Sequence, residues 1–264
     1  MDFLHSLKNQ LLGCVWLMAA GSAAAQGTAS VAAASDLKFA LDEVVAMFHK
    51  DTGQSARVSY GSSGNFMRQI AQDAPFELFL SADEAFVFQL AERKLTVDRG
   101  VLYATGRIVL FATTASRLQP DAQLADLRRA IGDGRVTRLA IANPDHAPYG
   151  RAAKEALTSA GLWDLVQPRL VLGENVSQAA QFAVSGSTQG GIFAYSLVLA
   201  PAFAQAGRYV LIPENLHQPL RQRMALTPKA GPTARALYAY LQQPAARAVL
   251  RRYGFALPGE TTPG

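Results

Sequence analysis

Serine hydroxyls stand at two junctions where an expected strand gives way to an expected helix. Ser35 lies in the segment AAASDL, and Ser62 and Ser63 lie in the segment YGSSGN. The start of a helix carries unpaired backbone N–H groups and the positive end of the helix dipole. Each junction therefore offers hydrogen-bond donors to a negatively charged ligand.

Two later junctions have the same character. NPDHAPYG, at 143–150, carries the phenol of Tyr149, and GENVSQ, at 173–178, opens a helix near Val176. No Arg or Lys stands at the expected contact position of any junction, so uncharged donors would surround the ligand, as suits a fully deprotonated tetrahedral oxyanion. Taken alone, Ser35 is more often an N-cap than a ligand-binding residue. A Ser-Ser-Gly turn is equally ordinary, and Tyr149 could simply bury its ring.

Apolar periodicity predicts alternating strands and helices that would position these junctions. The expected strands are 30–34, 56–60, 76–80, 107–113, 139–143, 169–172, 190–194, 209–213 and 223–227. The expected helices are 37–50, 65–72, 84–92, 123–130, 151–160, 176–184, 233–241 and 245–253. Such alternation predicts an α/β fold of parallel sheets covered by helices, with ligands beyond the carboxyl ends of the strands.

Composition indicates a globular protein of moderate charge. The chain has 264 residues, of which 50% are hydrophobic and 17% charged, so it can bury one large core or two smaller ones. The net charge of +5 comes from scattered Lys and Arg residues rather than from a basic stripe. This pattern does not indicate a nucleic-acid-binding surface, and the excess charge mildly favours anions.

The first 25 residues are predicted to be a signal peptide. Lys8 precedes an apolar stretch at 11–20, and Ala23 and Ala25 fit a small-x-small cleavage site with the cut after Ala25. The stretch is too short to span a membrane. Cys14 lies within it, so the mature chain is expected to contain no cysteine and no disulfide.

At the same junctions the chain resembles the periplasmic molybdate-binding proteins of ABC transporters. The resemblance runs from about residue 31 to 255 and is carried by short segments in a fixed order. These are AAASDL, YGSSGN, PFELFLSAD, NPDHAPYGRAAKEAL, GENV, GGIFAYS and RRYGF. It implies a type II periplasmic binding protein with two α/β lobes joined by a two-crossing hinge. Lobe I would hold 26–107 and 222–264, and lobe II would hold 108–221.

The resemblance also implies a set of ligand-binding residues for molybdate or tungstate. Ser35 and Ser63 would give hydroxyl and amide donors, with Ser62 beside them, and Val176 would give its backbone N–H. Tyr149 would lie at the cleft, and Asp36 would contribute its backbone rather than its carboxylate. The oxyanion would be held through these groups, with no direct protein ligand to the metal and no cofactor.

One position departs from the family pattern. Some members place a tyrosine ligand in the strand that matches GIFAYS, where this chain has Ala194, with Tyr195 one place later. Adjacent strand residues face opposite sides, so Tyr195 is not expected to replace that tyrosine. Tyr149 is expected to supply the phenol instead.

The expected mechanism is hinge closure around the anion, followed by docking of a monomer onto a membrane permease coupled to a cytoplasmic ATPase. Sulfate and phosphate are rival ligands in the same fold. A hydrolase using Ser63, His146 and Asp145 is a different class, but vicinal Asp and His cannot form the usual relay. Zinc binding by the isolated His49, His146 and His217 is a third reading, and a DNA-linked regulatory domain is a fourth.

Overall fold

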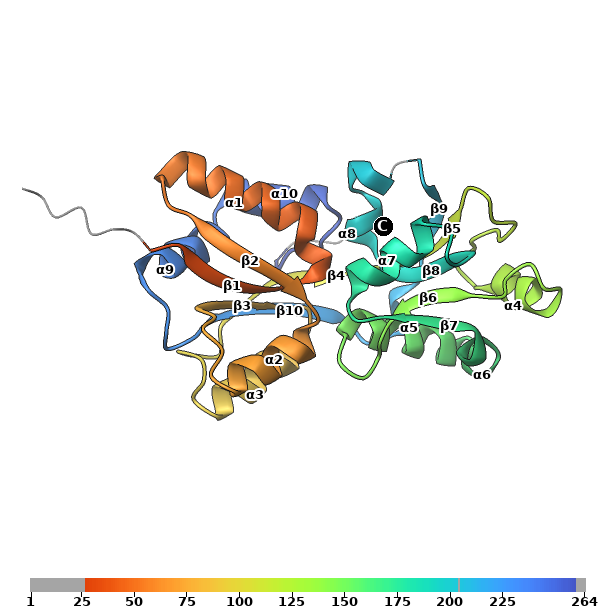
Figure 1. Cartoon of the computed structure of the whole chain (residues 1–264), viewed down its shortest axis with the longest axis horizontal. Coiled ribbons are helices and arrows are strands. Elements are labelled where there is room, and N and C mark those ends of the chain that lie inside the picture. Colours follow the sequence, from red (N-terminus) through yellow and green to blue (C-terminus); the bar gives the residue numbers. More distant parts are fainter. Residues whose placement is uncertain (1–26, 204, 260–264) are drawn as a thin grey trace, which may run out of the picture.

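The computed structural model describes residues 27–203 and 205–259, which form two α/β lobes side by side along the long axis of the molecule (Figure 1). Each lobe is built on one five-stranded mixed sheet with helices on its faces. The fold class expected from the sequence is therefore confirmed. The predicted signal peptide and its cleavage site lie outside the described residues. No described helix is both long enough and apolar enough to span a membrane.

The first sheet has the strand order β2-β1-β3-β10-β4. Its strands are β1 (Ala29–Ala34), β2 (Ala56–Gly61), β3 (Leu78–Ser81), β4 (Val101–Gly106) and β10 (Leu220–Leu226). Strand β1, second in this order, runs parallel to both neighbours, pairing Val31 with Val58 and with Leu78, whereas β10 runs antiparallel to β3 and β4. The carboxyl ends of β1 and β2 consequently meet at one edge of the sheet, where Ser35, Ser62 and Ser63 follow.

Helices cover both faces of this sheet, as Figure 1 shows. One face packs a core from α1 (Lys38–Thr52), α9 (Pro232–Tyr240) and α10 (Pro244–Arg252), and the other packs α2 (Ser63–Ala71) and α3 (Glu84–Glu92). In α1 the residues Leu41, Val44 and Phe48 recur at helical spacing and are fully buried. This packing fixes where α1 and α2 begin, which is where the candidate serines lie.

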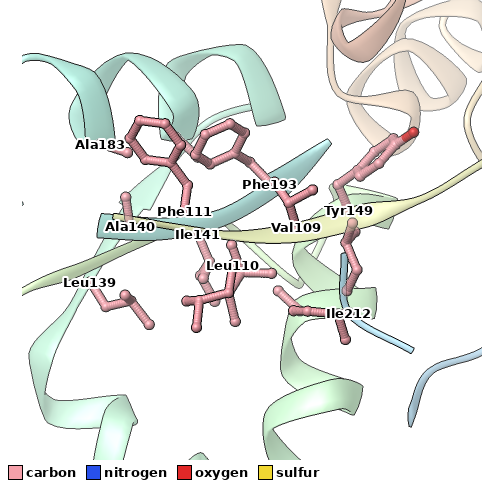
Figure 2. Close-up of a cluster of buried hydrophobic side chains, with 14 of the residues drawn as sticks. Val109, Leu110, Phe111, Leu139, Ala140, Ile141, Tyr149, Ala183, Phe193 and Ile212 are labelled. Carbon is pink, nitrogen blue, oxygen red and sulfur yellow. The ribbon is translucent and has the colours of Figure 1, made fainter. Parts of the chain in front are cut away.

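The second sheet has the strand order β7-β6-β8-β5-β9. Its strands are β5 (Ile108–Thr113), β6 (Leu139–Ala142), β7 (Leu170–Gly173), β8 (Gly190–Ala194) and β9 (Gly207–Leu211). Its helices are α4 (Ala125–Gly132), α5 (Pro148–Ser159), α6 (Trp163–Val166), α7 (Val176–Val184) and α8 (Tyr195–Val198). Figure 2 shows Phe111 and Phe193 on one face of this sheet and Leu110 and Leu139 on the other. The two phenylalanine rings lie 5.4 Å apart between centroids, so the strand alternation fills both layers.

The chain crosses between the two sheets twice. It leaves the first sheet at the end of β4, at Gly106, and enters β5 at Ile108. It returns between the end of β9, at Leu211, and the start of β10, at Leu220. An edge strand of the first sheet therefore leads directly into a strand of the second.

Several element boundaries differ from the sequence expectation. Strand β4 was not expected, because it is an edge strand held by antiparallel pairing with β10 rather than by a clear alternation of its own. The short helices α6 and α8 were also missed. Helix α5 begins at Pro148 rather than at 151, since proline is well suited to the first position of a helix. The expected bounds of α3, α7 and β8 are confirmed.

Candidate functional site

A small cavity lies where the two lobes meet, and residues from all four junctions line it. The lining includes Ser35, Ser62, Ser63, Tyr149 and Val176. The space between the lining atoms measures about 180 Å³, but only about 10 Å³ of it is open to the centre of a water-sized sphere, about what one water molecule needs. In this closed arrangement the cavity is thus narrow, and only a ligand with few atoms could occupy it.

The two lobe I junctions present hydroxyl groups that do not cap the helices that follow them in the chain. Ser62 is the N-cap residue of α2, yet its side chain makes no capping hydrogen bond. Ser63 is the first residue of α2, and its Oγ accepts a hydrogen bond from Ala82 N at 2.9 Å. Ser35 directly follows β1 and is 2% exposed. Simple capping therefore does not account for these serines.

The lobe II junctions begin two helices at the same cavity. Val176 is the first residue of α7, whose N-cap residue Asn175 accepts a hydrogen bond from Gln178 N at 3.1 Å. Tyr149 is the second residue of α5 and is buried, with its hydroxyl directed away from the apolar cluster (Figure 2). Helices α2, α5 and α7 therefore all direct N-terminal residues to the cavity, and their dipoles favour negative charge there.

Hydrogen bonds across the cleft join the lobes on one side of the cavity. Ser35 Oγ donates to Asn175 Oδ1 at 3.0 Å and accepts from Ser177 N at 3.2 Å. Ser177 Oγ donates to the Ser35 carbonyl oxygen at 2.7 Å, and Ser196 Oγ donates to the Asp36 carbonyl oxygen at 2.8 Å. These contacts mean that the structure describes the lobes in a closed arrangement.

A second set of contacts joins α2 to the loop before α5. Ser62 Oγ and His146 Nδ1 are 2.9 Å apart, and Gly64 N donates to the His146 carbonyl oxygen at 3.0 Å. A Cβ added at Gly64 would lie only 2.6 Å from that oxygen. Asp83 and Arg151 form an ion pair between the lobes. Close approach of the lobes here depends on the missing side chain of Gly64.

A buried polar network surrounds the Asp36 carboxyl group. Asp36 Oδ2 accepts hydrogen bonds from Tyr149 Oη at 2.9 Å and from Gln222 Nε2 at 2.6 Å. Gln222 Nε2 also lies 3.0 Å from Tyr149 Oη, and Tyr103 Oη donates to Gln222 Oε1 at 2.7 Å. Asp36 Oδ1 is buried and has no hydrogen-bond partner among the described residues. Two side chains thus engage one carboxylate oxygen and none engages the other, although the backbone amides of Asp36 and Leu37 lie near enough to lower the pKa of the group.

Burial dominates the acid–base properties of this network. Desolvation raises the pKa of Asp36 to about 6, although the hydrogen bonds from Gln222 and Tyr149 oppose the rise. Desolvation and the nearby Asp36 charge also raise the pKa of Tyr149 and of Tyr103 well above its usual value. Both phenols therefore remain protonated and act as donors at neutral pH.

Ala194 and Tyr195 do not line the cavity. Ala194 is the fully buried last residue of β8. The Tyr195 ring lies 5.9 Å from the Tyr209 ring, and it would contact any Cβ added at Gly254. Tyr195 begins α8 and its ring packs on these neighbours, so its phenol is not directed to the site.

Several residues of this region had no clear sequence signal. Gln222 lies in β10, 186 positions after Asp36, and nothing local marks it. Ser177 and Ser196 bond to backbone carbonyl groups of the other lobe. Asn175 could have been found as the N-cap residue before Val176, since asparagine is a preferred cap.

The geometry does not assemble the hydrolase considered from the sequence. His146 contacts Ser62 through Nδ1, whereas Ser63 Oγ accepts from a backbone amide. The described residues contain no group of three or more His, Cys, Asp or Glu side chains placed to hold a metal ion.

A larger hollow of about 990 Å³ lies along α5 and the 215–218 segment, but it is open to solvent. None of Ser35, Ser63, Tyr149 or Val176 lines it. Its lining mixes acidic and basic side chains, including Glu155 and Lys154. The small cavity between the lobes, where donors converge, is the better candidate for anion binding.

Comparison with known proteins is consistent with this geometry. Residues 29–256 match the family model described as bacterial extracellular solute-binding protein. Molybdate-binding protein ModA of Azotobacter vinelandii is 34% identical, with 97% of this chain and 100% of that protein covered. Molybdate-binding protein ModA of Rhodobacter capsulatus is 32% identical, with 96% and 98% covered.

Solved structures give the same result. The periplasmic molybdate-binding protein of Azotobacter vinelandii superposes with a TM-score of 0.79 and 28% identity, over 87% of this chain and 99% of that one. The sulfate-binding protein SubI of Mycobacterium tuberculosis H37Rv shares the fold, with a TM-score of 0.72 at 15% identity over 88% and 87%. The chain belongs to the bacterial extracellular solute-binding protein family, alongside the ModA molybdate-binding proteins.

Proposed function

We propose that this protein captures molybdate or tungstate outside the cytoplasm and delivers it to an ABC importer. The observation that carries the proposal is the small cavity between the lobes, lined by hydroxyl groups and helix N-termini from both lobes. No Arg or Lys is among its lining residues. Relatives that are 32% and 34% identical over nearly their whole length are named as molybdate-binding proteins, which supports this choice of oxyanion.

The proposed ligand groups come from both lobes. Ser35 and Ser63 donate hydroxyl and amide hydrogens from lobe I, with Ser62 beside them, and Val176 donates its backbone N–H from lobe II. The Ser35 hydroxyl, which donates to Asn175 Oδ1 in this arrangement, turns to the anion when the anion binds. Tyr149 lies at the cavity, but its hydroxyl donates to Asp36, so we assign it to positioning the Asp36 carboxyl group. Uncharged donors can neutralise an anion in a closed cavity because the hydrogen bonds and dipoles there are little screened by water.

The proposed mechanism is closure of two lobes around the anion. Lobe I would comprise 26–107 and 222–264, and lobe II 108–221, with the hinge at the two crossings between the sheets. An anion that bonds donors from both lobes stabilises the closed form relative to the open form. The closed monomer would then dock on a membrane permease that is coupled to a cytoplasmic ATPase.

Export through a cleaved signal peptide at 1–25 and a periplasmic location are part of the proposal. The match to a family of extracellular solute-binding proteins and the likeness to a periplasmic molybdate-binding protein support export and this location. We assign the protein no enzymatic activity and no cofactor, because the cavity serves to hold its ligand through hydrogen bonds.

Calorimetric titration of the protein with molybdate, tungstate, sulfate and phosphate tests the proposed ligand. Molybdate or tungstate should bind more tightly than sulfate and phosphate, and tighter binding of either rival would refute the choice. Ser35→Ala and Ser63→Ala should each weaken binding by roughly 10- to 150-fold, since a hydrogen bond to a charged group contributes about 1.5–3 kcal/mol. Ser59→Ala, on the exposed side of β2, is the matched control and should bind like the parent protein.

A further inference from the structure

Asp36 supplies the single carboxyl group among the described residues that line the cavity. The side chain is 1% exposed, so solvent does not reach it in the closed arrangement. Its Oδ2 atom accepts two hydrogen bonds, from Tyr149 and Gln222, whereas its Oδ1 atom has no partner among the described residues. A buried polar atom of this kind normally has a hydrogen-bond partner, which points to a ligand group at Oδ1.

The charge of this carboxyl group conflicts with the proposed ligand if it is ionised. The titratable side chains facing it are Tyr149 from α5 and Tyr103 from β4, and both are neutral phenols. Gln222 from β10 and Ser196 from α8 are uncharged, and no described Arg, Lys or His bonds the carboxyl group. An ionised Asp36 would therefore face a dianion in a closed cavity with no cation between them, which is strongly unfavourable.

We propose that the site binds its dianion together with one proton, which lies between Asp36 Oδ1 and an oxygen atom of the anion. The inference rests on the proposed function, because it requires an oxyanion in this cavity. The protonated Oδ1–H group donates to the anion, as the serine hydroxyls do, while Oδ2 continues to accept from Tyr149 and Gln222. Every polar atom of the carboxyl group is then paired, and the proton comes from solution.

The proton makes anion affinity depend on pH in a defined direction. The pKa of Asp36 is about 6 even when the closed arrangement buries the side chain, so the carboxyl group is mostly ionised at pH 7.5 before the anion binds. A bound dianion raises this pKa further, so binding takes up about one proton between roughly pH 7 and pH 8. The association constant then falls by nearly tenfold for each pH unit in that window. As pH falls below 6, a growing fraction of the carboxyl groups is protonated before binding and the uptake decreases.

Calorimetry in buffers that differ in ionisation enthalpy measures this proton uptake directly. Molybdate, tungstate, sulfate and phosphate are titrated into the full chain at about pH 5 and pH 7.5. We expect the binding of molybdate to take up about 0.9 protons or more at the higher pH, and fewer at the lower pH. An uptake near zero at both pH values, with molybdate still bound, would overturn this inference and leave the proposed function standing.

Asp36→Asn separates this role from a structural one. The asparagine amide can donate from Nδ2 to the anion and accept at Oδ1 from Tyr149 and Gln222, so it imitates the protonated acid. The variant should bind molybdate without proton uptake and, at about pH 8, at least tenfold more tightly than the parent protein. Asp42→Asn, an exposed carboxyl on α1, is the control and should leave the uptake unchanged. A variant that binds molybdate with the same proton uptake as the parent would contradict the inference, and no binding of any of the four anions by the parent would overturn both proposals.

Discussion

Substitution of Gly64 by alanine should weaken anion binding without weakening the fold. The new methyl group would lie 2.6 Å from the carbonyl oxygen of His146 in the other lobe. Such contacts are not found below 3.0 Å, so the two lobes must separate locally by roughly 0.4 Å or more. The separation strains two hydrogen bonds between the lobes, one from Gly64 N to the His146 carbonyl oxygen and one between Ser62 Oγ and His146 Nδ1.

The expected loss of molybdate affinity in Gly64→Ala comes from overpacking and from the weakened contacts between the lobes. Forcing a methyl group into a packed contact costs about 1–3 kcal/mol, which corresponds to a dissociation constant roughly 5- to 150-fold larger. The open form has no such clash, and alanine is favoured over glycine in a helix such as α2. The melting temperature of the protein without anion should therefore stay unchanged or rise slightly while the affinity for molybdate falls.

Titration calorimetry with molybdate gives the affinity, and thermal unfolding without anion gives the stability. Gly132→Ala is the matched control, because this helical glycine in α4 has nothing within 4 Å of the added Cβ. That control should leave the affinity unchanged. An affinity of Gly64→Ala within twofold of the parent protein would refute the reasoning that binding requires the lobes to close at this contact.

Three further outcomes are expected. Tyr149→Phe removes a hydrogen bond that joins the lobes in the closed form, so the affinity for molybdate should fall by about 2- to 12-fold. A pH titration of the closed form should find the pKa of Asp36 above about 6. Because that folded-state pKa exceeds the usual value of 3.8, the Asp36 contribution to stability is present below about pH 4 and is lost as pH rises through 6. Denaturant unfolding should therefore show Asp36→Asn gaining about 2 kcal/mol on the parent protein from pH 4 to 7. A Cβ in Gly106→Ala would lie 2.1 Å from Tyr149 Oη in the other lobe and 2.8 Å from Gln222 Nε2, so titration calorimetry should report a molybdate affinity roughly 5- to 150-fold weaker.

The alternation of strands and helices was readable from the sequence because buried strands and amphipathic helices impose different apolar periods. β8 and α7 were expected at their observed bounds for this reason. Strand β4 was not predicted, because this edge strand is held in its conformation by pairing with β10, which lies more than a hundred residues later. Periodicity within a short window carries no information about such a partner.

The site residues likewise fall into those that local sequence patterns indicate and those that depend on distant parts of the chain. Ser35, Ser63 and Val176 could be proposed from sequence because each lies at a strand-to-helix junction, where local rules apply. The role of Gln222 and the unpaired Oδ1 atom of Asp36 could not be predicted from the sequence, because both depend on packing between distant segments. His146 looked like an isolated histidine, and only the closed arrangement pairs it with Ser62.

A crystal structure of the protein with bound molybdate, with the anomalous signal of molybdenum, tests whether helix N-termini from both lobes jointly hold the anion. The metal should lie in the cavity between the lobes, with oxygen atoms of the anion within hydrogen-bonding distance of Ser35, Ser63 and Val176 N. An anomalous peak in the open hollow beside α5, or a molybdate contacted by one lobe alone, would contradict this interpretation.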